Sequence, residues 1–115
     1  MTNKSTGKYG EDVASDFLTK NGYKIIEKNF KYSKIAEIDI IALKNNILHF
    51  VEVKTRTTSD FGNPLEAVNK TKLNSIYKAA CFYINKNGYK KFQIDVIGII
   101  LKDNSIQFIE NIALN

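Results

Sequence analysis

The most hydrophobic stretch of the chain is interrupted by four charged side chains, those of Glu37, Asp39, Glu52 and Lys54. The stretch reads AEIDIIALKNNILHFVEVK over residues 36–54, and its two apolar runs flank Asn45-Asn46. Asparagine tolerates the positive φ angles of a two-residue turn, so the pattern predicts a tight β-hairpin. In such a hairpin Asp39 lies opposite Glu52, and Glu37 lies opposite Lys54.

This register would bring all four charged side chains to one face of the sheet, because side chains alternate along a strand. Facing Cβ atoms are about 5 Å apart, and two carboxylates at that distance repel each other by ~3 kcal/mol at an effective dielectric constant of about 20. Lys54 would offset part of this repulsion, and a divalent cation would offset more. The pattern therefore predicts a site for Mg²⁺ or Mn²⁺, with Asp39, Glu52 and the carbonyl of Val53 as ligands. The alternative for Asp39, Glu52 and Lys54 is a partly exposed ion-pair cluster at a strand end. Glu37, which faces Lys54, is expected to form a salt bridge with it rather than to bind the metal.

Hydrolysis of a phosphodiester is the reaction that suits these side chains. The metal would polarise the phosphate and favour hydroxide formation, while Lys54 would orient the attacking water or stabilise the developing charge. Glu11 lies at the margin of the apolar stripe of the first expected helix, a position from which it could ligate the metal. A carboxylate that merely suits the helix dipole is the alternative for Glu11. Arg56 and Lys72 are candidates for nucleic-acid phosphate contacts.

The elements that would position these side chains follow from apolar spacing and turn residues. Helical periodicity predicts a first helix over residues 5–21, with Gly22 as its left-handed cap. A second helix ends near Gly88 and begins either at Pro64, within a capping-box pattern, or after Asn69. Strands are expected over residues 23–30, 36–43, 47–54, 92–100 and 105–112. The order α-β-β-β-α-β-β, with the second helix as a crossover to a parallel strand, predicts a mixed α/β sheet flanked by helices.

Composition narrows the class of protein. A chain of 115 residues, 43% hydrophobic and 25% charged, is expected to form one globular domain over 1–115. The single cysteine, Cys81, excludes an internal disulfide framework and a thiolate zinc cluster. No apolar run is long enough for a membrane span and no secretory signal is visible, which favours a cytoplasmic protein. The net charge of +5 favours polyanionic partners without specifying one.

The pattern of Asp39 followed by Glu52-Val53-Lys54 resembles the core of the PD-(D/E)XK nucleases, a superfamily with a restriction-endonuclease-like fold. More closely, the chain resembles the YraN-type family of small bacterial endonuclease-like proteins. The matching residues run through nearly the whole chain and are Gly10-Glu11, Ala14, Phe17-Leu18, Gly22-Tyr23, Asn29-Phe30, Glu37-Ile38-Asp39-Ile40-Ile41-Ala42, Phe50-Val51-Glu52-Val53-Lys54-Thr55-Arg56, Phe61-Gly62, Lys72 and Asp95-Val96.

The resemblance implies a metal-dependent nuclease fold related to archaeal Holliday-junction resolvases, with Glu11, Asp39, Glu52 and Lys54 at its active site. Two positions depart from the family pattern. Ala36 replaces the usual glycine, and Gln93 stands where an arginine is favoured, which removes a phosphate or ion-pair contact.

Residues and resemblance together predict an Mg²⁺- or Mn²⁺-dependent endonuclease that acts on nucleic acid. DNA is the expected substrate, including branched or otherwise structured DNA. A homodimer would allow so small a domain to cover two strands. The alternative is a nucleic-acid-binding module, with weak catalysis or none, that serves a DNA repair, recombination or uptake assembly.

Overall fold

The fold is described by a computed structural model that covers residues 3–58 and 68–112, with side chains from Gly7 onward. Its elements are α1 (Asn3–Lys20), β1 (Lys24–Tyr32), β2 (Ala36–Lys44), β3 (Ile47–Arg56), α2 (Lys70–Asn87), β4 (Phe92–Ile100) and β5 (Ser105–Ile109). This order is the predicted α-β-β-β-α-β-β. No helix among the described residues is both long enough and apolar enough to cross a lipid bilayer.

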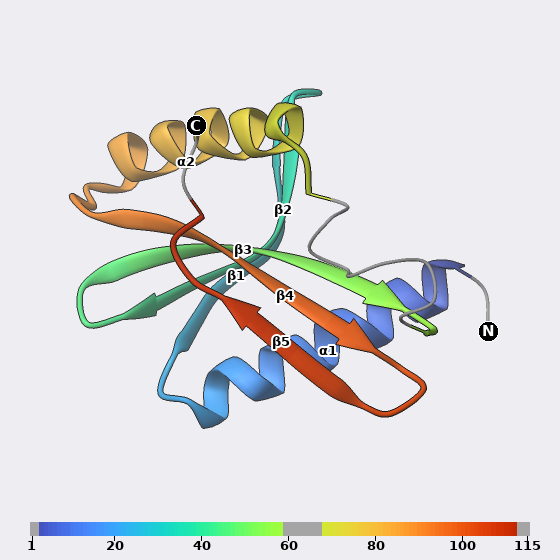
Figure 1. Ribbon diagram of the computed structural model, residues 1–115. Coiled ribbons are helices and arrows are strands. Elements are labelled where there is room, and N and C mark those ends of the chain that lie inside the picture. The colour runs from blue at the N-terminus through green and yellow to red at the C-terminus, as the bar shows by residue number, and fades with distance from the viewer. Residues whose placement is uncertain (1–2, 59–67, 113–115) are drawn as a thin grey trace.

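The strands form one five-stranded sheet in the order β1-β2-β3-β4-β5. β3 and β4 pair in parallel, as predicted for strands joined by a crossover helix, and the other neighbours are antiparallel. α1 and α2 lie on opposite faces of the sheet (Figure 1). The two strands that carry the charged residues, β2 and β3, are interior strands of the sheet.

Each face of the sheet has its own hydrophobic core. On the α2 face, Ile41 and Phe50 pack with Ile76 and its neighbours along the helix. On the α1 face, residues of the same hairpin that point the other way, including Val51, pack against Leu18. The hairpin is therefore held from both sides, which fixes the position of the polar residues at its open end.

The start of α2 was predicted at either of two places. The side chain of Asn69 accepts a hydrogen bond from the Lys72 amide at 2.9 Å, so Asn69 is the N-cap and the helix begins at Lys70. The alternative start at Pro64 lies outside the described residues. At the other end Gly88 takes the left-handed conformation, φ 77°, that its predicted role as a stop requires.

Close packing of α1 on β3 predicts opposite effects for two glycines of the same helix. A Cβ at Gly10 would overlap the hydroxyl of Thr55 on β3, whereas a Cβ at Gly7 would meet nothing within 4 Å. Gly10→Ala should therefore destabilise the fold by about 1–3 kcal/mol through overpacking. Gly7→Ala should stabilise it by up to about 1 kcal/mol, the helix-propensity difference. Urea unfolding of both variants checks this, and equal shifts in the same direction would contradict the tight contact.

Candidate active site

The hairpin of β2 and β3 has the predicted turn and register. Asn45 and Asn46 both adopt positive φ, 53° and 65°, as a two-residue type I′ turn requires. Ile41 pairs with Phe50, and Ile40 pairs with Val51. Continued by one residue, this register brings Asp39 level with Glu52.

The backbone ladder between β2 and β3 gives way to a side-chain contact at Asp39. The last backbone pair is Ile40 with Val51, and Asp39 Oδ2 then accepts a hydrogen bond from the Val53 amide at 2.8 Å. The carboxylate of Asp39 thus replaces a backbone acceptor. It is fixed beside the Glu52-Val53 segment and remains only half-buried.

Glu37 does not take the position that strict alternation predicted. Ile38 packs in the α2-side core together with Ile41, three residues later, so the alternation of faces is broken between them. Glu37 is consequently exposed, and it lines a cavity with Glu11 and Lys28 on the α1 side. The expected salt bridge between Glu37 and Lys54 is not among the ion pairs of the described residues.

The carboxyl group of Glu52 is the most deeply buried acid of the site, with its side chain 3% exposed. Its Oε1 atom lies 3.8 Å from Lys54 Nζ and 3.5 Å from Lys72 Nζ. Its Oε2 atom is buried and has no hydrogen-bond partner among the described residues. Burial, and then the negative charge of Asp39, raise the pKa of Glu52 to about 8, against the opposing effect of the two lysines. The site therefore holds a carboxylate that lacks sufficient positive charge around it.

Glu11 and Lys54 complete the predicted set, and both feel the same environment. Glu11 reaches the site from α1, where burial and the charge of Asp39 raise its pKa. Burial also lowers the pKa of the Lys54 ammonium, although Glu52 opposes that shift. Each of these pKa shifts favours the neutral form of the side chain, and such shifts are concentrated at functional sites.

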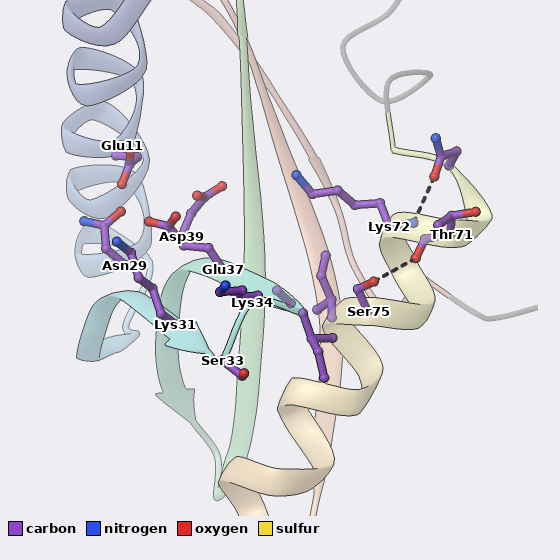
Figure 2. A pocket seen from close by; sticks show the side chains of 14 residues that line it. Glu11, Asn29, Lys31, Ser33, Lys34, Glu37, Asp39, Thr71, Lys72 and Ser75 are labelled. Carbon is purple, nitrogen blue, oxygen red and sulfur yellow. Dashed lines mark hydrogen bonds between the residues drawn. The ribbon is translucent and has the colours of Figure 1, made fainter.

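The predicted residues line one cavity of about 500 Å³, including Glu11, Asp39, Glu52, Val53, Lys54, Arg56 and Lys72. Figure 2 shows Glu11 on α1 at one side and Lys72 on α2 at the other, with Asp39 between them. Arg56 is half-buried and donates to the carbonyl of Thr55 at 3.2 Å. The structure thus brings together the predicted metal ligands, Lys54 and the two candidate phosphate contacts, whereas Glu37 lies outside this cavity lining.

Comparison with known proteins places the chain in a family. The model of UPF0102, described as an uncharacterised protein family, matches residues 10–99, a range that contains every predicted site residue from Glu11 to Lys72. The chain belongs to the UPF0102 family. It is 50% identical over 103 residues to a UPF0102 protein of Dictyoglomus thermophilum, which covers 88% of this chain and 86% of the relative. It is 46% identical over 108 residues to one of Caldanaerobacter subterraneus subsp. tengcongensis (92% and 88%), and 44% identical over 116 residues to one of Clostridium botulinum (95% and 94%).

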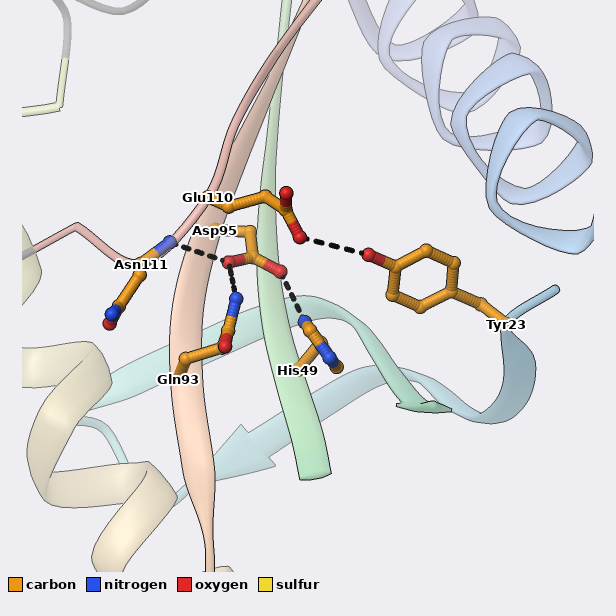
Figure 3. Close-up of polar contacts among 6 residues, drawn as sticks. All are labelled: Tyr23, His49, Gln93, Asp95, Glu110 and Asn111. Atoms are coloured by element: carbon orange, nitrogen blue, oxygen red, sulfur yellow. Dashed lines mark hydrogen bonds and ion pairs between the residues drawn. The ribbon is translucent and has the colours of Figure 1, made fainter. Parts of the chain in front are cut away.

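Asp95 belongs to a network separate from the acidic cavity in this UPF0102 protein (Figure 3). Its Oδ2 atom lies 2.6 Å from His49 Nδ1, and its Oδ1 atom accepts from Gln93 Nε2 and from the Asn111 amide, each at 2.9 Å. Asp95 is fully buried and these donors surround it. Its contact with the Asn111 amide ties the segment after β5 to the sheet, and its contact with His49 links β4 to β3.

The same network contains a group of side chains with the spacing of metal ligands. Among the described residues, it is the one group of His, Cys, Asp and Glu side chains that offers three ligand atoms within 4.8 Å of one another. The group is His49, Asp95 and Glu110. Hydrogen bonds already engage each member: His49 contacts Asp95, and Glu110 accepts from the Tyr23 hydroxyl at 3.2 Å. Burial and the Glu110 charge raise the pKa of Tyr23 to about 12, which keeps the phenol a donor. We therefore assign this group to holding the sheet edge together.

Proposed function

We propose that this protein is a divalent-metal-dependent nuclease of the PD-(D/E)XK superfamily that cleaves phosphodiester bonds of nucleic acid, with DNA as the substrate. The single observation that carries the proposal is the buried, unpartnered Oε2 atom of Glu52 beside the Asp39 carboxylate. A buried carboxylate oxygen without a donor is costly, and a cation bound between the two acids would compensate it.

The donor set fits Mg²⁺ or Mn²⁺. Asp39 and Glu52 offer carboxylate oxygens, and the Val53 carbonyl adds a further hard oxygen of the kind these ions prefer. Mg²⁺ keeps several waters in protein sites, so two carboxylates suffice, and Glu11 would act through such a water. A bound cation would polarise the phosphate and supply a nucleophilic hydroxide.

The remaining side chains of the cavity suit the handling of a phosphodiester. Lys54 is half-buried beside Glu52, a position in which an ammonium group orients water or stabilises charge on the phosphate. Arg56 and Lys72 add positive charge at the cavity wall, where the flanking phosphates would lie. Two copies of the chain would cover both strands of a duplex, and a homodimer forms part of this proposal.

Asp39→Asn tests the metal site directly. Saturating Mg²⁺ or Mn²⁺ should raise the unfolding temperature of the natural chain, since ligand at ~100 times its Kd adds about 2.7 kcal/mol. The variant keeps an oxygen for the Val53 amide but loses the charge, so its metal-dependent shift should disappear. A thermal-shift titration measures this, with the exposed Glu37→Gln as the control that keeps its shift. Equal shifts in Asp39→Asn and the natural chain would rule out this site.

Cleavage of linear, flapped and four-way DNA and of RNA, assayed with Mg²⁺, identifies the substrate. One observation favours a second function, a nucleic-acid-binding module: Lys54 and Lys72 both form ion pairs with Glu52. Metal-independent binding without cleavage of any of these substrates would favour that module over the nuclease.

A further inference from the structure

Lys72 occupies the boundary between two cavities. Its side chain lines the acidic cavity of about 500 Å³ and also a larger one of about 680 Å³, which extends toward the turn between β1 and β2. In Figure 2 it extends from the first turn of α2 toward the acidic side chains. Although its Nζ atom is 3.5 Å from the buried Glu52, its side chain remains 41% exposed. Lys72 is therefore a counter-ion of Glu52 with access to solvent.

A divalent cation and Lys72 would compete for the same carboxylate. The cation requires Glu52 oxygens at about 2.1 Å, and an ammonium group within 4 Å of that carboxylate would be repelled by the added positive charge. Lys54 is exposed to the same repulsion, but it lies on the interior strand β3 and its side chain is only 21% exposed. Lys72 is the lysine with room to leave.

The larger cavity offers Lys72 a new partner when a nucleic acid is bound. Its walls combine Lys31 and Lys34 from the β1–β2 region with Thr71 and Ser75 from α2. Lysines and hydroxyl groups at a groove are the side chains that contact phosphate oxygens, and an ammonium–phosphate contact is a charge-assisted hydrogen bond. A phosphodiester in this cavity would lie next to the acidic site, within reach of the side chain that the cation displaces.

We propose that Lys72 is an exchangeable counter-ion: it pairs with Glu52 in the metal-free protein, and the cation displaces it onto the phosphodiester beside the cleavage point. The inference rests on the proposed metal site. Its consequence is that metal and nucleic acid strengthen each other's binding. The metal frees Lys72 to contact the phosphate, and the phosphate withdraws Lys72 from the metal site, so the coupling is reciprocal. Lys72 is thus a positioning residue that couples the two ligands.

Lys72→Ala should change the two affinities in opposite directions. Without the competing ammonium, Mn²⁺ titrated into the nucleic-acid-free variant by calorimetry should bind at least about 5-fold more tightly than to the natural chain. Anisotropy of a labelled, phosphorothioate-linked duplex should show weaker DNA binding, and the gain in DNA affinity on adding Mg²⁺ should fall toward none. A residue that only contacts phosphate would weaken DNA binding without improving Mn²⁺ binding.

Lys31→Ala is the matched control, because Lys31 lines the larger cavity without an ion pair to Glu52. It should weaken DNA binding, retain the gain caused by Mg²⁺, and leave Mn²⁺ affinity nearly unchanged. Suppose that Glu52→Gln abolishes Mn²⁺ binding. Unchanged or weaker Mn²⁺ binding in Lys72→Ala would then overturn the exchange of Lys72 and leave the proposed metal site intact. Mn²⁺ binding that survives in Glu52→Gln, or is absent from the natural chain, would overturn both proposals.

Discussion

Replacing Glu52 by glutamine should abolish metal-dependent cleavage and yet make the metal-free protein more stable at pH 8 than the natural chain. Loss of a ligand that supports several kcal/mol of transition-state stabilisation corresponds to a decrease in rate on the order of 10³ or more. The gain in stability has a separate cause. Glutamine has the shape of the neutral acid, and burial favours that neutral form of Glu52 in the fold.

The pH dependence of this gain follows from the direction of the pKa shift. The pKa of Glu52 is raised from 4.5 to about 8 by folding. Below the lower value the carboxyl group is protonated in both states, so it costs nothing. Between the two values the unfolded chain releases a proton that the folded chain retains, and stability falls as the pH rises. Above the upper value the full penalty remains, on the order of 5 kcal/mol.

Urea unfolding in the presence of a chelator, at several values from pH 4.5 to pH 8.5, measures this penalty. The difference in unfolding free energy between Glu52→Gln and the natural chain should be near zero at the acidic end and should grow toward the alkaline end. Glu37→Gln, a change at an exposed position near the same cavity, is the matched control. A Glu52→Gln variant that is less stable than the natural chain at pH 8 would show that the lysines fully compensate the buried charge.

Much of the fold was predictable because local signals agree with one another. The two asparagines set the turn, and the turn fixes the register, so the placement of Asp39 beside Glu52 follows from residues that are close in sequence. The bounds of α2, the helix that connects β3 to β4, are likewise marked by local signals, which are the N-cap Asn69 and the C-terminal Gly88. These features needed no knowledge of distant contacts.

The sequence could not show which acidic and basic side chains would meet across elements. Glu37 was misplaced because Ile38 turns into the α2-side core, an effect of packing that alternation ignores. Lys72 was assigned to phosphate contacts alone, and its ion pair with Glu52 depends on how α2 lies across the sheet. Its only local signal is a position in the first turn after the Asn69 cap. Burial of Glu52, the source of its raised pKa, likewise depends on tertiary packing.

Lys54→Met should separate metal binding from catalysis. The substitution keeps the length of the aliphatic side chain and removes the ammonium group that lies 3.8 Å from Glu52. Mn²⁺ binding should persist, because Asp39 and Glu52 are intact and one competing positive charge is gone. Cleavage should fall by about 10²–10³-fold, the usual effect of removing a group that stabilises developing charge.

The contrast with Glu52→Gln decides what Lys54 does. If both variants lose cleavage and only Lys54→Met retains Mn²⁺, the ammonium acts on the water or the phosphate and the acids act on the metal. Lys28→Met controls for the general loss of positive charge, because Lys28 contacts Asp12 rather than Asp39 or Glu52. This variant should retain most of the cleavage rate. Normal cleavage by Lys54→Met would instead make this lysine a structural counter-ion, because the remaining groups would then suffice for the reaction.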